Sequence, residues 1–384
     1  MTVQEIETVH ELDVYSRRDI VLVQGEGCTL YDEQGKAYLD CTSNVGVSLL
    51  GYGNEKIARA IYDQYMTLPS CYSIFYNNVR ARLTQKLIDI TPQGLSRVFY
   101  CNSGTEAVEA ALKCARFTTQ KSDIICAVRG FHGKTLGALG ATWDIHYKTS
   151  MGPVPLGYVH VPFNNFEKLE AAVTADTAAI LLEVIQGEGG IRVGDLSFFE
   201  KVRALCDTEG IVLILDEVQT GFGRTGAMFG CEHYVIPDIL CLAKGIAGGV
   251  PMGAMVCKEF IHIPKHGHTS TFGGNPLACV AALASITIIE EQKLVQKCAE
   301  NGEYFLHALS RLDPPVIKEV RGMGLMIGVE LHEKAGPYVQ ALMEKGILVL
   351  LAGKYVIRLL PPLIISRKEI DHAVHTMAEV LTSY

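Results

Sequence analysis

The chain has 384 residues, of which 48% are hydrophobic and 20% are charged, and its formal net charge is −8. This length and composition are typical of a globular enzyme with a large core and up to two domains. The acidic balance argues against a nucleic-acid-binding or membrane-surface protein, because both need a basic footprint, and no apolar run is long enough to span a membrane.

From about residue 57 to about residue 264, the chain alternates between apolar strands and amphipathic helices. Short strands are predicted near the N-terminus, over 20–23 and 29–39. Further strands are predicted at 98–101, 124–128, 179–184, 211–215, 239–243 and 254–257, with helices at 105–118, 166–173 and 197–209. Near-continuous hydrophobic strands separated by helices indicate the α/β class, with a mostly parallel sheet covered on both faces.

The pattern changes after residue 275. A long helical stretch is predicted over 277–312, followed by strands at 316–320, 323–330, 347–350 and 356–359 and a final helix from residue 367. These segments indicate a smaller α+β domain, which the N-terminal strands would join. We therefore expect a large domain at 50–275 and a small discontinuous domain formed by 1–49 and 276–384.

Two apolar runs end abruptly in opposite charges, one at Asp216 and the next at Lys244. Ligands of open parallel sheets bind at the carboxyl ends of the strands, so we expect both side chains at one edge of the sheet. Pyridoxal phosphate chemistry needs such a pair: a lysine to bind the cofactor covalently and a carboxylate for its ring nitrogen. Once displaced by substrate, Lys244 would be a free amine able to move a proton, and Gln219 could reach the ring hydroxyl.

Residues 97–113 read as a strand, a turn of small residues and a helix. Ser103 or Thr105 can cap the helix, and Gly104 lets the backbone approach a ligand closely. The free N–H groups of the first helical turn would then form an anion site. Taken alone, the same turn is also compatible with a plain helix cap that binds nothing.

Two further strand ends carry candidate side chains. Phe131 is flanked by glycine in the following loop and could stack on a planar ring, although alone it also reads as a core residue. His132 reads as a polar loop residue rather than a metal ligand, because no partner with ligand spacing is nearby, and no metal site is predicted. Glu188 lies in the glycine-rich loop 186–190, either solvated or held against a cation.

The glycines of 221–226 match the G-x-G-x-x-G pattern of dinucleotide sites. In those sites the glycines open a helix directly after a strand. Here five residues separate the pattern from the strand, and no convincing helix follows. We therefore do not favour a nicotinamide or flavin cofactor.

The 12 cysteines are scattered singly, with no C-x-x-C pair. Many lie inside apolar runs, which is typical of buried small hydrophobic residues in a reducing compartment rather than of disulfides or a metal site. The acidic N-terminus lacks a signal-peptide core. We therefore expect a cytoplasmic protein.

Taken together, the motifs resemble the class III (omega) aminotransferases of pyridoxal-phosphate fold type I over nearly the whole chain. The matching blocks are 103–107, 131–133, 186–190, 215–226, 243–245, 270–278 and Arg358 with 361–363. The resemblance implies pyridoxal 5'-phosphate as cofactor, bound by Lys244, with Asp216 at its ring nitrogen. The residues expected to bind the cofactor are Ser103, Gly104, Thr105, Phe131, His132, Asp216, Gln219, Lys244 and Thr271.

The resemblance also implies a homodimer, because Thr271 in this family binds the phosphate in the neighbouring subunit. Glu188 and Arg358 are expected to act as a switch. Paired, they favour an omega-amine donor; apart, Arg358 binds the α-carboxylate of glutamate or 2-oxoglutarate, since one guanidinium can hold either carboxylate.

The acetylornithine aminotransferase subgroup is the most similar. The resemblance implies a ping-pong transfer of an omega-amino group from N-acetylornithine, or a similar acylated diamino acid, to 2-oxoglutarate. Residues expected to bind substrate are Tyr15, Val45, Lys134, Glu188 and Arg358. Relatives acting on acidic amines usually have Arg where this chain has Lys134, so putrescine or 4-aminobutyrate remain alternative donors, and an aminomutase or racemase of the same fold is a third possibility.

Overall fold

The computed structural model describes residues 1–149 and 152–383. Its largest element is a seven-stranded sheet in the order β4-β12-β11-β10-β7-β5-β6. The strands are β4 (Leu95–Cys101), β5 (Asp123–Ala127), β6 (Tyr158–Val161), β7 (Thr177–Leu182), β10 (Val212–Asp216), β11 (Ile239–Leu242) and β12 (Gly253–Lys258). Only the pairs that involve β12 are antiparallel. The predicted α/β class with a mostly parallel sheet is confirmed.

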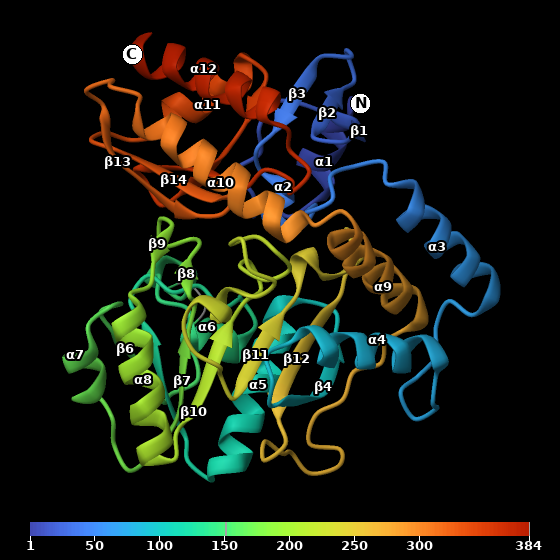
Figure 1. Cartoon of the computed structure of the whole chain (residues 1–384), viewed down its shortest axis with the longest axis vertical. Coiled ribbons are helices and arrows are strands. Elements are labelled where there is room, and N and C mark those ends of the chain that lie inside the picture. The colour runs from blue at the N-terminus through green and yellow to red at the C-terminus, as the bar shows by residue number, and fades with distance from the viewer. Residues whose placement is uncertain (150–151, 384) are drawn as a thin grey trace.

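Helices cover both faces of this sheet (Figure 1). Every residue of β7, β10 and β11 is buried, as their continuous apolar sequences require. Alternate residues enter separate cores: Leu213 and Leu215 share one with α8 (Leu196–Glu209), whereas Val212 and Ile214 share the other with α5 (Gly104–Thr119). The edge strand β6 was not predicted, because it is only partly buried and a histidine interrupts its apolar residues.

The predicted helix over 277–312 is two helices, α9 (Pro276–Glu291) and α10 (Leu294–Ser310). The break lies at Lys293, whose φ of 53° is left-handed and ends the helical path. α9 packs against α3 (Glu55–Thr67) and α4 (Asn78–Ile90), while α10 packs against β13 (Ile317–Met323). The break therefore lets the two halves of this helical stretch serve two parts of the molecule.

The second region contains two four-stranded sheets. One is formed by β1 (Leu22–Glu26), β2 (Thr29–Asp32), β3 (Ala37–Asp40) and β15 (Ile347–Leu348), and the other by β13 (Ile317–Met323), β14 (Met326–Leu331), β17 (Val356–Leu359) and β16 (Leu350–Ala352). Helices α11 (Gly336–Glu344) and α12 (Arg367–Ser383) lie beside them at the top of Figure 1. Strand β3 pairs in parallel with β15, which joins the two ends of the chain. This pairing supports the small discontinuous domain that we propose for 1–49 and 276–384.

The remaining elements are short. They are α1 (Val3–His10), α2 (Ser43–Gly46), α6 (Leu136–Ala141), α7 (Phe166–Glu170) and the hairpin of β8 (Ile185–Gln186) with β9 (Arg192–Val193). No helix in the described part of the chain is long and apolar enough to cross a membrane.

Candidate functional site

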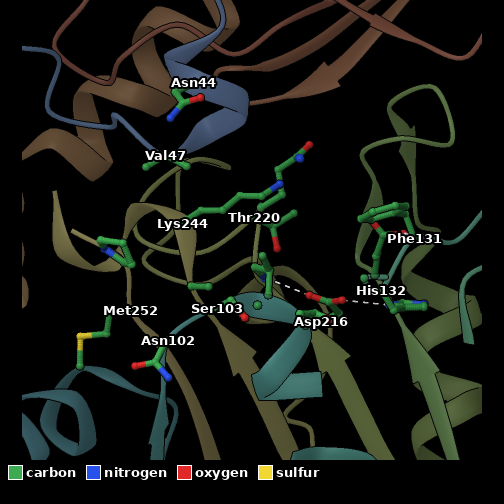
Figure 2. A pocket seen from close by; sticks show the side chains of 18 of the residues that line it. Asn44, Val47, Asn102, Ser103, Phe131, His132, Asp216, Thr220, Lys244 and Met252 are labelled. Atoms are coloured by element: carbon green, nitrogen blue, oxygen red, sulfur yellow. Dashed lines mark hydrogen bonds and ion pairs between the residues drawn. The ribbon is translucent and has the colours of Figure 1, made fainter. Parts of the chain in front are cut away.

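A cavity of about 430 Å³ lies at the carboxyl ends of the central strands. Nine of the residues predicted from the sequence line it, namely Ser103, Gly104, Thr105, Phe131, His132, Glu188, Asp216, Gln219 and Lys244. Figure 2 shows Lys244 reaching into the cavity, with Asp216 and Ser103 below it and Phe131 beside His132 on one side. Asn44 and Val47 enter from the N-terminal segment above (Figure 2). The sheet edge thus gathers side chains that are up to 141 positions apart, from Ser103 to Lys244.

Asp216, the last residue of β10, is held by two contacts. Its Oδ2 lies 2.9 Å from Nδ1 of His132, the contact drawn as a dashed line in Figure 2, and its Oδ1 accepts a hydrogen bond from the Val218 N–H at 3.1 Å. The His132 backbone N–H in turn donates to Thr142 Oγ1 at 2.9 Å. Both Asp216 and His132 are buried. A fixed carboxylate at the floor of a cavity suits a cationic ring nitrogen.

Lys244 follows β11 and begins the 3₁₀ helix Lys244–Ala247. Its φ of 45° is unusual for a residue other than glycine, and such strain concentrates at functional sites. Burial, reinforced by the nearby Arg358 cation, lowers the pKa of the Lys244 amine to about 8. The amine is therefore far more often uncharged near neutral pH than an exposed lysine, as a nucleophile or proton acceptor requires.

The N-terminus of α5 opens onto the cavity. Ser103 caps it by accepting a hydrogen bond from the Glu106 N–H at 3.4 Å. Gly104 and Thr105 line the cavity, and their N–H groups, in the first helical turn, have no carbonyl within the helix to bond. A Cβ on Gly133 would lie 2.2 Å from Thr105 Oγ1, so only glycine lets this loop approach the helix so closely. The turn is therefore built as an anion site.

Glu183 is a site residue that the sequence reasoning missed. It is buried, lines the cavity and accepts hydrogen bonds from two loops, at Oε1 from the Phe131 N–H (3.0 Å) and at Oε2 from the Gly187 N–H (3.1 Å). Burial, together with the charge of Asp216, raises the pKa of Glu183 to about 7 against the opposing effect of His132. The available signal was a single charge inside the apolar run 179–184.

Glu188 and Arg358 are paired across the two regions of the molecule. Arg358 lies in β17 and is buried, and its Nη1 is 2.6 Å from Oε1 of Glu188, whose side chain is 33% exposed. The loop that carries Glu188 is anchored beyond it, where Arg321 Nε donates to the Gly190 carbonyl at 3.1 Å. The pairing predicted from the family resemblance is thus present in the structure.

Five residues predicted to bind ligands do not line this cavity, and one of them is Arg358, which contacts Glu188 of the cavity wall. Tyr15 is 71% exposed, and Thr271 is also exposed. Lys134 is exposed, with its Nζ 4.7 Å from the centre of the Tyr147 ring. Val45 lines a different cavity. Their roles stay predictions.

The residues present fit pyridoxal phosphate. The anion site at α5, the ring of Phe131 and the carboxylate of Asp216 match its phosphate, pyridine ring and ring nitrogen. Gln219 Oε1 is buried in the cavity wall and has no hydrogen-bond partner among the described residues, as expected of an atom that awaits a ligand.

Comparisons with known proteins agree with this geometry. A family model described as Aminotransferase class-III matches residues 14–381. An acetylornithine aminotransferase of Methanocaldococcus jannaschii is 46% identical over 98% of this chain and 97% of its own length. A LysW-aminoadipate semialdehyde transaminase of Deinococcus radiodurans is 43% identical over 98% of this chain and 89% of its own.

Solved structures show the same likeness. The ornithine aminotransferase from Toxoplasma gondii has a TM-score of 0.95 at 29% identity, covering 99% of this chain and 94% of its own. The acetylornithine aminotransferase from Elizabethkingia anophelis has a TM-score of 0.88 at 30% identity, covering 99% of this chain and 98% of its own.

Proposed function

The chain belongs to the class III aminotransferases, which depend on pyridoxal phosphate, and we propose that it moves the omega-amino group of an N-acylated diamino acid to 2-oxoglutarate. N-acetylornithine is the leading donor, and the products are the semialdehyde and glutamate. The observation that carries this proposal is the Glu188–Arg358 pair beside Lys244. A guanidinium that can be either paired with Glu188 or free suits an enzyme in which one substrate binds it through a carboxylate and the other does not.

The predicted cofactor residues of the cavity have separate roles in the proposal. The cofactor, when bound, withdraws electrons from the bond that must break at the amine-bearing carbon. Lys244 anchors the cofactor and, once released, moves the proton at that carbon. Asp216 keeps the ring nitrogen protonated, Phe131 packs on the ring, and the N-terminus of α5 holds the phosphate.

Arg358 would serve the acceptor. While Glu188 neutralises it, the cavity suits the omega end of a donor, which carries an amine and no carboxylate. The α-carboxylate of 2-oxoglutarate can replace Glu188 on the same guanidinium, because both are planar bidentate anions. One site thereby accepts two different substrates in turn.

A putrescine or 4-aminobutyrate aminotransferase is the second candidate. Within this alternative, putrescine is favoured by Lys134, which lies over the Tyr147 ring and outside the cavity, because putrescine has no carboxylate whereas 4-aminobutyrate has one. The loop after β5 therefore places no guanidinium in the cavity for a donor carboxylate from this position.

The donor is tested by supplying the cofactor-loaded protein with 2-oxoglutarate and, separately, N-acetylornithine, putrescine or 4-aminobutyrate. We expect kcat/KM for N-acetylornithine to exceed the others by roughly tenfold or more, measured as glutamate formed. Fast turnover of putrescine with none of N-acetylornithine would contradict the leading donor. Rearrangement of any donor without 2-oxoglutarate would indicate an isomerase instead.

We also infer a homodimer in which Thr271 completes the neighbouring site. Three successive apolar residues are exposed beside it, Ile74 (70%), Phe75 (64%) and Tyr76 (106%), and Phe272 is 63% exposed. The Ser73 hydroxyl donates to the Gly273 carbonyl at 3.3 Å, which brings the two segments together. An apolar surface of this kind is typical of an interface between subunits.

Changing Ile74 to Asp should separate the subunits and remove most activity. A charge placed in an apolar interface costs several kcal/mol, which weakens association by roughly a hundredfold or more. Sedimentation velocity and glutamate formation measure the two effects. Leu156→Asp, at a side chain that is 92% exposed in the loop before β6, is the control and should change neither sedimentation nor activity. A wild-type chain that sediments as a monomer would contradict the dimer.

A cytoplasmic location is inferred from the cysteines. All twelve are free, and all are buried except Cys71, which is half-buried. Buried unpaired cysteines behave as small hydrophobic residues and are usual in a reducing compartment.

A further inference from the structure

A second cavity, of about 440 Å³, adjoins the first, because Phe131 and Glu188 line both. It lies between the loop after β5, the segment after α6, the β8–β9 hairpin and the turn between β16 and β17. The first cavity holds the reacting groups, so the second is placed to receive whatever part of a substrate extends beyond them. None of the roles given above uses it.

The carboxylates that line this second cavity are already engaged. Asp144 Oδ1 lies 2.8 Å from His146 Nδ1, and Glu330 contacts two cations, each at 2.6 Å. Glu188 is paired with the buried guanidinium of β17. The cationic partners in these contacts, besides His146, are Lys318, Arg321 and Arg358.

Two arginines that line the second cavity have no such partner. Within the described residues, the side chains of Arg129 and Arg192 make no hydrogen bond or ion pair, and Nε of Arg192 is buried without a partner. Burial, followed by the charges of Arg129 and Arg321, lowers the pKa of Arg192 against the opposing effect of Glu330 and Glu319. The guanidinium groups of Arg129 and Arg192 therefore lie close enough to repel each other. A buried unpartnered donor beside a second cation is costly until an anion binds it.

The backbone holds these arginines beside the Glu188 loop. A Cβ on Gly189 would lie 2.8 Å from the Arg129 carbonyl oxygen, so the loop packs directly on Arg129. Arg192 opens β9, where it pairs with Gln186 of β8. Both residues therefore flank the Glu188–Arg358 pair in the closed state, in which Arg358 is not free to bind a carboxylate.

We propose that Arg129 and Arg192 bind the α-carboxylate of the amine donor in the second cavity, an assignment that rests on the proposed function. The donor places its omega-amine at Lys244, and its other end extends past Phe131 and Glu188 to the two guanidinium groups. Lys134, over the Tyr147 ring, is not the partner of this carboxylate. The pair thereby selects amino acids over diamines of the same length.

The test compares N-acetylornithine with N-acetylputrescine, which lacks only the α-carboxylate. Arg192→Gln should lower kcat/KM for N-acetylornithine by roughly ten- to a hundredfold, because a charged hydrogen bond of about 1.5–3 kcal/mol is lost. The same variant should leave N-acetylputrescine and the reaction of 2-oxoglutarate unchanged. Arg129→Gln should behave alike, and Arg192→Lys should recover part of the loss, since it keeps the charge without the fork.

The matched control is Arg311→Gln, at an exposed arginine after α10, which should leave kcat/KM unchanged for both N-acetylornithine and N-acetylputrescine. Equal losses of kcat/KM for both substrates in the arginine variants would overturn the assignment. So would a loss of kcat/KM that is specific to N-acetylornithine and occurs in Lys134→Gln but in neither Arg192→Gln nor Arg129→Gln. If the wild type turns over N-acetylornithine and Arg192→Gln has the same kcat/KM for it, the carboxylate site is contradicted but the proposed function is not. Wild-type protein that accepts no acylated diamino acid contradicts the proposed function and the assignment with it.

Discussion

Replacing Lys244 with alanine is expected to lower kcat by roughly 10⁴-fold or more, because the variant loses both the cofactor anchor and the amine that moves the substrate proton. Burial lowers the pKa of this amine to about 8. Among the described residues, Lys244 is the one lysine that lines the cavity, so no other lysine there could take its place. Glutamate formation and the amount of cofactor retained after dialysis measure the two losses separately.

The control for Lys244→Ala is Lys297→Ala, at an exposed lysine of α10, which should behave as the wild type. A small primary amine added to Lys244→Ala should restore part of the activity, since it can carry the proton in place of the side chain. Activity of Lys244→Ala within tenfold of the wild type would show that the role belongs to another residue.

Asp216→Asn is the second change with a large expected effect. It keeps the shape of the side chain and its acceptor for the Val218 N–H, but removes the charge that would hold a ring nitrogen protonated. We expect kcat to fall by roughly 10²–10³-fold with little change in KM, as for the loss of one preorganised electrostatic partner. Steady-state kinetics with saturating cofactor measure the split.

The neighbouring His132 sharpens that experiment. Its Nδ1 faces Asp216 Oδ2 at 2.9 Å, so an amide nitrogen placed there would meet a second donor unless the imidazole changes tautomer. Asp216→Glu, which keeps the charge and displaces it, should retain more activity than Asp216→Asn. The reverse order would show that geometry, not charge, is what Asp216 contributes.

The positions of Asp216 and Lys244 were predictable because they depend on local pattern alone. Each ends a continuous apolar run, and strands of that kind become neighbours in a parallel sheet, here β10 and β11 with Asp216 opposite Cys241. Phe131 and Glu188 were also singled out at strand ends, and the blocks that resemble class III aminotransferases added Arg358 as the partner of Glu188. Strand ends and short motifs therefore gave most of the cavity.

Contacts between distant loops were not predictable in the same way. Glu183 meets the Phe131 N–H across 52 positions, and no periodicity indicates which loop a buried carboxylate will reach. The break at Lys293 was missed because neither glycine nor proline occurs there, and the left-handed turn follows from the packing of the two helices instead. Lys134 likewise lies over the ring of Tyr147, thirteen positions further on, and its sequence neighbours do not indicate this contact.

The two anchors of the glycine-rich loop have a consequence for the speed of substrate exchange. Glu183 fixes the loop before Glu188, by accepting from the Gly187 N–H, and Arg321 fixes it after, by donating to the Gly190 carbonyl. With its backbone held on both sides, Glu188 can leave Arg358 by rotating its own side chain. A side-chain rotation is a smaller motion than the opening of a lid, which takes microseconds or longer. In the proposed function, Glu188 and the acceptor carboxylate would therefore exchange at Arg358 without a movement of the loop backbone.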